Sequence, residues 1–180
     1  PHSQLVATFA LALFDQTRGV LHQWGPLERQ VLWAAAMLHN SGHFVSHGSH
    51  HKHSYYLIRN GELLGFTSAE IELIANVARY HRKSAPKLKH EPYKALTKHS
   101  RRVVNQLSAM LRVAVGLDRR RVGAIATFQT TYDPDVHTMT LGFTPNHPQD
   151  SCELEIWSVN DKKGCFEQEF DLTLTIEQAA

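Results

Sequence analysis

The sequence predicts an α+β protein, with an all-helical part over residues 1–121 and a small mixed part over residues 122–180. Apolar residues recur at helical spacing through most of the first part. After Arg121, β-branched and aromatic residues gather in short segments that alternate with polar residues, which is typical of strands. With 42% hydrophobic residues, the 180-residue chain can bury a core in one medium domain or two small ones.

Apolar spacing and stop signals predict the first helices. Gly19 is expected to end the first helix and Gly42 the second, and Pro26 suits the first turn of the second. Further on, Thr67 and Glu70 form a capping box, in which each side chain satisfies a free backbone N–H group of the other residue. The helices are predicted over residues 3–17, 27–38, 50–59, 68–81 and 93–118, the last with a possible break near His99 and Ser100.

The second part reads as short strands around one helix. Asp133-Pro134-Asp135 is a turn between the first two of them. The alternation of Cys152, Leu154 and Ile156 with polar neighbours predicts a third strand with one exposed face. The predicted strands cover residues 124–132, 136–143, 152–157 and 172–176, with a short helix over 160–170.

Positive and negative charges are segregated along the chain, although the net charge is only +2. Residues 79–121 hold 13 of the 19 Lys and Arg residues against two acids, whereas residues 122–180 hold ten acids against two lysines. Such separation produces a local electrostatic field that the net charge conceals. The basic middle region therefore favours a polyanionic partner.

Composition also restricts the location of the protein. No apolar run of about 18 residues could cross a bilayer and no signal peptide is visible, so we expect no membrane partner. Cys152 and Cys165 could pair, but nothing else indicates secretion, so free thiols in a reducing cytoplasm are the favoured interpretation. Because the chain begins Pro-His-Ser without Met, we expect a piece of a longer polypeptide.

Six histidines stand within fifteen positions, directly after the second predicted helix: His39, His43, His47, His50, His51 and His53. Histidine is a common metal ligand and titrates nearest neutral pH, so this density indicates metal or phosphate chemistry. A divalent ion in phosphate chemistry also requires carboxylates, and no acid lies between Glu28 and Glu62. The simpler alternative is that these side chains form backbone hydrogen bonds in a tight loop and line the next helix.

The segment Ala36-Met37-Leu38-His39-Asn40-Ser41-Gly42-His43 resembles the signature of the HD-domain superfamily, in which a His-Asp pair ends the second helix. Residues 44–86 and 111–120 resemble the C-terminal HD-like domain of the exopolyphosphatase/guanosine pentaphosphate phosphohydrolase (Ppx/GppA) family. The stretches His-Lys-His-Ser-Tyr-Tyr-Leu-Ile and Ala-Arg-Tyr-His-Arg-Lys make this match specific. The resemblance implies an HD-like helical domain over 1–121, followed by a small α+β domain over 122–180.

The resemblance also implies where the metal site of the superfamily would lie. His2 and His39 match its two histidines, whereas Asn40 replaces the paired Asp and Val115 stands where a later Asp is expected. A neutral amide is a poor ligand for a hard divalent ion, and valine is no ligand. We therefore expect a degenerate site that binds no metal, in a region with no catalytic residues of its own.

In the resembled family, hydrolysis belongs to an N-terminal actin-like module. The glycines of this chain are isolated and form no phosphate-cradling loop, so that module is not contained here. The resemblance implies that Mg²⁺ and the catalytic residues belong to the N-terminal module of the same polypeptide. It implies further that this region needs no cofactor and that the protein is a homodimer.

Basic residues and histidines supply candidate ligands for inorganic polyphosphate. Lys94, Lys98 and Arg102 are spaced by four and would share one face of a continuous helix, where like charges repel unless an anion is bound. Arg binds phosphate oxygens in a bidentate way, Lys acts as a point charge, and the histidines would add donors at mildly acidic pH. The predicted polyphosphate-binding residues are His43, His51, His53, His81, Arg82, Lys83, Lys94, Lys98, Arg101 and Arg102.

Two other functions are compatible with the sequence. An autonomous HD-type metal phosphohydrolase would need the carboxylates that Asn40 and Val115 replace. A nucleic-acid-binding module would use the same basic residues, but only Tyr80 and Tyr93 lie among them, which provides little base stacking. The favoured interpretation is a non-catalytic C-terminal region of a phosphoanhydride hydrolase, which binds polyphosphate or another polyanion and guides it.

Overall fold

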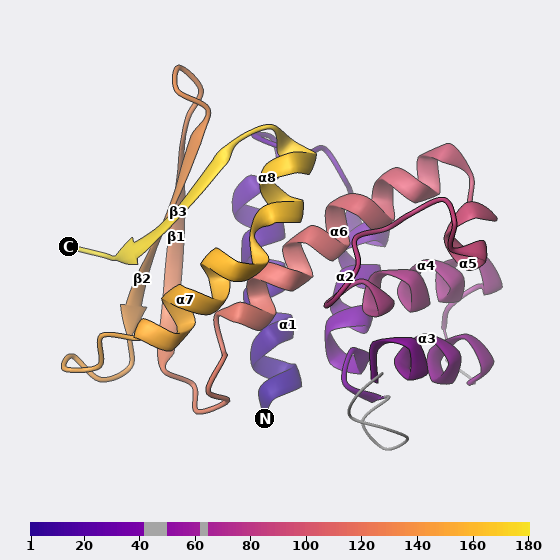
Figure 1. The fold of residues 1–180 in the computed structure, drawn as a ribbon, viewed down its shortest axis with the longest axis horizontal. Helices are drawn as coiled ribbons and strands as arrows, with labels where there is room; N and C mark the ends of the chain where they lie inside the picture. Colours follow the sequence, from indigo (N-terminus) through magenta and orange to yellow (C-terminus); the bar gives the residue numbers. More distant parts are fainter. Residues whose placement is uncertain (42–49, 62–64) are drawn as a thin grey trace.

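A body of helices lies beside a small sheet in this computed structural model, which describes residues 1–41, 50–61 and 65–180 (Figure 1). The helices in these residues are α1 His2–Thr17, α2 Pro26–Leu38, α3 His50–Asn60, α4 Ser68–Arg79, α5 Glu91–Lys94, α6 Lys98–Gly116, α7 Glu153–Lys162 and α8 Gly164–Phe170. The strands are β1 Ile125–Asp133, β2 Thr138–Pro145 and β3 Thr173–Gln178. The predicted α+β class is confirmed.

Helix α6 is the centre of the structure. It packs against α1, α2 and α4 of the helical body and against α7 and α8 of the C-terminal part. Figure 1 shows it crossing the middle of the molecule, with α2 to α5 on one side and α7, α8 and the sheet on the other. From Val103 to Gly116 nearly every one of its side chains is buried, because neighbours cover it on all sides.

The sheet has the strand order β1-β2-β3. β1 and β2 form an antiparallel hairpin, and β3 pairs parallel to β2 after a crossover through α7 and α8. Helix α1 packs on β1, with the rings of Phe9 and Phe128 5.9 Å apart and the Gln16 side chain bonded to the backbone of Phe128 and Thr130. One cluster of buried apolar side chains thus includes both parts of the chain, and the division at residue 121 stays a prediction.

Helix α7 lies very close to the end of α6. A Cβ atom added at Gly116 would lie 3.1 Å from the backbone nitrogen and from Cγ2 of Val159, so only glycine permits this approach without a shift. Next to this contact, Arg120 donates hydrogen bonds to the fully buried carboxylate of Glu155 from its backbone nitrogen at 3.0 Å and from Nη2 at 2.7 Å. The guanidinium of Arg120 also donates a hydrogen bond to the carboxylate of Asp150, from Nη2 to Oδ2 at 2.9 Å.

Several predicted boundaries are confirmed. Gly19 follows α1 with a φ of 83°, a conformation that favours glycine. The capping box at α4 is present: the Thr67 hydroxyl accepts a bond from the Glu70 backbone at 3.1 Å, and the Glu70 carboxylate accepts one from the Thr67 backbone at 2.8 Å. Gly42, the predicted end of the second helix, lies outside the described residues.

Three predictions about local structure are wrong. The strand predicted over 152–157 is the first half of α7, because the buried positions are Cys152, Glu155, Ser158 and Val159, at helical spacing, rather than every second residue. The helix predicted over 160–170 is divided at Lys163 between α7 and α8. The break predicted near His99 occurs earlier, at residues 95–97, so Lys94 on α5 does not share a helix face with Lys98 and Arg102 on α6.

The remaining expectations concern thiols and membranes. Cys152 and Cys165 are free thiols, the first buried and the second half-buried. Within residues 1–41, 50–61 and 65–180, no helix combines the length and the apolarity needed to span a bilayer.

Candidate functional site

The predicted metal position lies where the start of α1, the end of α2 and the end of α6 meet. His2 Nδ1 lies 2.6 Å from Oδ2 of Asp118, and the rings of His2 and His39 are 5.6 Å apart. Asp118 also accepts a bond from the Gly123 backbone at 3.1 Å. We expected Val115 to leave this position without an acid, but the structure places the carboxylate of Asp118, three residues later, against His2.

These residues do not fit a divalent ion. The carboxylate of Asp118 is already bonded to His2 and Gly123, and Asn40 offers only a neutral amide. His39 Nδ1 donates to the Ala36 carbonyl at 2.5 Å, so His39 can offer only its Nε2, which has no hydrogen-bond partner within the described residues. Among the residues that the structure describes, no group of three or more His, Cys, Asp or Glu side chains is arranged to hold a metal.

A directed chain of hydrogen bonds joins α3 to the end of α4. His81 Nδ1 donates to the Ala78 carbonyl at 2.5 Å, so its Nε2 is an acceptor, and it lies 2.8 Å from His50 Nε2. Arg82 Nη1 lies 2.7 Å from His50 Nδ1 and is always a donor. Because Arg82 can only donate, these distances fit the donor order Arg82, His50, His81 and finally the carbonyl of Ala78.

Burial keeps histidines of this region neutral. Burial lowers the pKa of His39 to about 4, although the hydrogen bond to the Ala36 carbonyl acts in the opposite direction and raises it. The pKa of His51 is also about 4, lowered by burial and then by Arg82, and burial holds the pKa of His81 well below 6.5. The expectation that His51 and His81 gain charge at mildly acidic pH is therefore wrong, because their surroundings disfavour the imidazolium.

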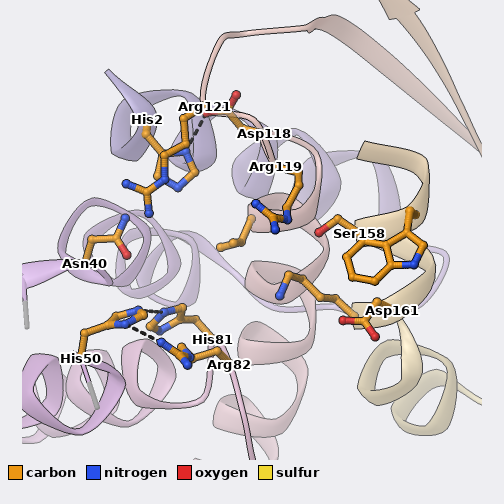
Figure 2. A pocket seen from close by; sticks show the side chains of 13 residues that line it. His2, Asn40, His50, His81, Arg82, Asp118, Arg119, Arg121, Ser158 and Asp161 are labelled. Carbon is orange, nitrogen blue, oxygen red and sulfur yellow. Dashed lines mark hydrogen bonds and ion pairs between the residues drawn. The ribbon is translucent and has the colours of Figure 1, made fainter. Parts of the chain in front are cut away.

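A polar cavity of about 390 Å³ opens beside His50 and His81 (Figure 2). His2, Asn40, His50, His81 and Arg82 line it from the helical body, together with Val115 and Asp118 at the end of α6. The sequence did not single out the other lining residues: Arg121, which lies beside His2, and on the opposite side Arg119 after α6 with Trp157, Ser158, Asp161 and Lys162 on α7. We call it the α6/α7 cavity.

A second hollow, of about 610 Å³, lies along the start of α6. Lys98, Arg101 and Arg102 line it together with Trp24, Leu88, Tyr93, His99 and Asn105. Arg101 Nε donates to the Leu96 carbonyl at 3.2 Å, which fixes that guanidinium at the wall. The Trp24 and His99 rings meet edge to face with centroids 5.4 Å apart. We call it the α6 groove.

The structure divides the predicted polyphosphate-binding residues among several places. His81 and Arg82 line the α6/α7 cavity, and Lys98, Arg101 and Arg102 line the α6 groove. Lys83 and Lys94 are exposed and line neither, and His51 and His53 lie on α3. His43 lies outside the described residues.

Sequence reasoning missed the wall of the α6/α7 cavity formed by Arg119, Ser158 and Lys162. The three consecutive arginines at 119–121 were a visible signal, since they follow a helix whose start is also basic. Ser158 and Lys162 gave no signal, because the segment before them was assigned to a strand and their face of α7 was not recognised.

Comparison with known proteins assigns the class of this chain. Residues 1–163 match the family Ppx/GppA phosphatase, domain III. The chain belongs to this family, which confirms the resemblance stated from the sequence.

Several similar proteins carry the name guanosine-5'-triphosphate,3'-diphosphate pyrophosphatase. The protein from Vibrio atlanticus (strain LGP32) is 30% identical over 160 residues, which are 87% of this chain and 31% of the relative. That from Pseudoalteromonas translucida (strain TAC 125) is 31% identical over 128 residues, which are 69% of this chain and 25% of the relative. The chain thus spans a quarter to a third of the length of these relatives.

Proposed function

We propose that this chain is the C-terminal region of a phosphoanhydride hydrolase of the Ppx/GppA type, and that it binds and guides a linear phosphate chain. Inorganic polyphosphate is the first candidate ligand and guanosine pentaphosphate the second. The hydrolytic residues and Mg²⁺ would belong to an actin-like module elsewhere in the polypeptide. The names of the relatives and the short share of their length that this chain covers support this division.

The α6 groove is the observation that carries the proposal. Lys98 and Arg102 are exposed and four residues apart on one helix, where like charges repel by a few tenths of a kcal/mol. They also lie at the start of α6, whose first turn holds no acid, although the helix dipole disfavours cations there. A bound phosphate chain would relieve both effects, and Arg101 adds a guanidinium for phosphate oxygens.

The double variant Lys98→Glu/Arg101→Glu is expected to weaken polyphosphate binding. Removing two phosphate contacts should lower affinity roughly tenfold at moderate salt and reduce the slope of log affinity against log salt by about 1 to 2. The measurement is a salt-titrated binding assay with fluorescently labelled polyphosphate. Lys87→Glu/Lys89→Glu is the matched control, because it changes net charge equally at exposed positions outside the groove.

Two outcomes would contradict this assignment. Equal affinity of Lys98→Glu/Arg101→Glu and wild type would remove the groove from the binding surface. An equal loss in the Lys87/Lys89 control would show that net charge, and not the groove, determines binding.

An autonomous metal phosphohydrolase is the second candidate, and the contact between His2 and Asp118 beside His39 favours it. The surrounding ligands do not fit a divalent ion. We therefore expect wild type to hydrolyse phosphate esters with Mn²⁺, Mg²⁺ or Zn²⁺ no faster than the His2→Ala variant does. Calorimetry should likewise show no stoichiometric binding of these ions. Tight binding that is lost in His2→Ala and His39→Ala would establish the second candidate instead.

Two further proposals complete this assignment. The free thiols of Cys152 and Cys165 support a reducing compartment, and we propose the cytoplasm. A homodimer is proposed from the family resemblance, and sedimentation of the purified protein tests it.

A further inference from the structure

The α6/α7 cavity has a strongly positive lining. Arg82, Arg119, Arg121 and Lys162 line it, against the carboxylates of Asp118 and Asp161. Asp118 is bonded to His2 and the Gly123 backbone, so its oxygens are already engaged. Within the part of the chain that the structure describes, none of Arg119, Arg121 and Lys162 forms an ion pair.

Nearby cations affect the pKa of Lys162. Burial lowers the pKa of its ammonium group; Asp161 raises that pKa, and Arg112, Arg119 and Arg82 lower it further. Three guanidinium groups, from the segment after α4, from α6 and from the segment after α6, thus act on one half-buried ammonium group. Such an arrangement is unfavourable unless an anion lies among them.

A buried hydroxyl group of the same lining has no partner. Ser158 is fully buried, and its Oγ atom forms no hydrogen bond within the described residues although it lines the cavity. An unmatched buried hydroxyl is unfavourable, and it indicates a ligand atom that accepts from it. Figure 2 shows Ser158 and Arg119 on the α7 side of the cavity, with Asn40 across from them and His50, His81 and Arg82 at another edge.

We infer that the α6/α7 cavity binds a small molecule through a phosphate or pyrophosphate group, held by Arg119, Lys162 and Ser158. Guanidinium, ammonium and hydroxyl donors that approach from different elements match a tetrahedral oxyanion with several acceptor atoms. The volume of about 390 Å³ is in the range of small-molecule sites, so there is room for more than the phosphate. The site goes beyond the proposed function, because it uses none of the residues that line the α6 groove.

Trp157 offers a surface for the rest of the ligand. Its side chain lines the cavity and is 58% exposed, so one face of the indole is accessible beside the cationic wall. An aromatic ring next to phosphate-binding groups suits a nucleotide base, which stacks on it. The phosphate group is common to free phosphate, pyrophosphate and a nucleoside diphosphate, and the experiment distinguishes them.

Isothermal titration calorimetry on the 180-residue chain tests this site with three probes at constant ionic strength: inorganic phosphate, pyrophosphate and guanosine diphosphate. We expect one-to-one binding of at least one probe. Arg119→Gln/Lys162→Gln should weaken it by about tenfold or more, and Ser158→Ala by a few-fold. If guanosine diphosphate binds more tightly than pyrophosphate and Trp157→Ala removes the difference, the ligand is a nucleotide; equal binding of both identifies the phosphate group alone.

The control is Lys87→Gln/Lys89→Gln, which changes two exposed lysines outside both the cavity and the α6 groove and should bind these probes as wild type does. The two proposals are separated by Arg119→Gln/Lys162→Gln, which should keep the polyphosphate affinity that Lys98→Glu/Arg101→Glu loses. Thermal unfolding checks that each variant is folded, and the single variants Arg119→Gln and Lys162→Gln replace the double variant if it is not. Absence of saturable binding for all three probes, or equal affinity in Arg119→Gln/Lys162→Gln, overturns the inference.

Discussion

Replacement of Arg120 by alanine is expected to lower the free energy of unfolding by about 3 to 5 kcal/mol. The carboxylate of Glu155 is fully buried and accepts bonds from Arg120 Nε and Nη2 at 3.0 and 2.7 Å. Without the guanidinium, this carboxylate keeps only the bond from the backbone nitrogen of residue 120. An uncompensated buried charge accounts for the size of the effect, which urea unfolding measures.

Arg29→Ala is the matched control for this prediction. Arg29 also binds a carboxylate with two nitrogens, that of Asp15, but both side chains are about half exposed. Exposed pairs contribute about 0 to 1 kcal/mol, so the control should change stability little. Arg120→Ala/Glu155→Leu should recover most of the loss, because it removes both charges. If Arg29→Ala and Arg120→Ala cost the same, the buried pair does not hold α7 on α6.

Stability is expected to fall as the pH decreases from about 7 to about 4. The folded state holds the pKa of His39 at about 4, below the value of 6.5 for an ordinary histidine, and lowers that of His81 in the same direction. Between these values the unfolded chain binds more protons, so protonation favours unfolding. His39 alone should account for a loss of about 3 kcal/mol in the free energy of unfolding. The full stability is present only above about pH 7.

Urea unfolding at a series of pH values measures this dependence. His39→Gln should reduce the slope between pH 6.5 and 4, because the replacement does not titrate. His147→Gln serves as the control, since His147 is exposed and its variant should keep the slope of wild type. A wild-type stability that is constant over this pH range would show that the buried histidines do not carry the dependence.

Local signals in the sequence predicted the helical body well. The periodic apolar stripes, Gly19 and the capping box of Thr67 and Glu70 depend on neighbours within one or two turns, so they can be read without knowledge of the fold. The same holds for the groove residues Lys98 and Arg102, whose spacing on one helix is a local property. The family was also accessible, because its motifs are contiguous.

Contacts between distant residues could not be predicted. Glu155 is buried because Arg120, 35 residues earlier, neutralises it, and this burial reverses the polarity pattern that indicated a strand. His2 and Asp118 meet across 116 residues, so spacing within the sequence could not identify Asp118 as the acid that faces His2. The α6/α7 cavity forms only when α7 packs on α6, and its missed residues follow from that packing.

Gly116 also affects the position of two residues that line the α6/α7 cavity. A Cβ atom at this position would lie 3.1 Å from Val159, so a larger side chain requires Val159 on α7 to shift by a few tenths of an ångström. Ser158 and Lys162 stand on either side of Val159 along that helix, so they would move with it. The absence of one methyl group on α6 thus permits the close approach of α7 that brings Ser158 and Lys162 to the α6/α7 cavity.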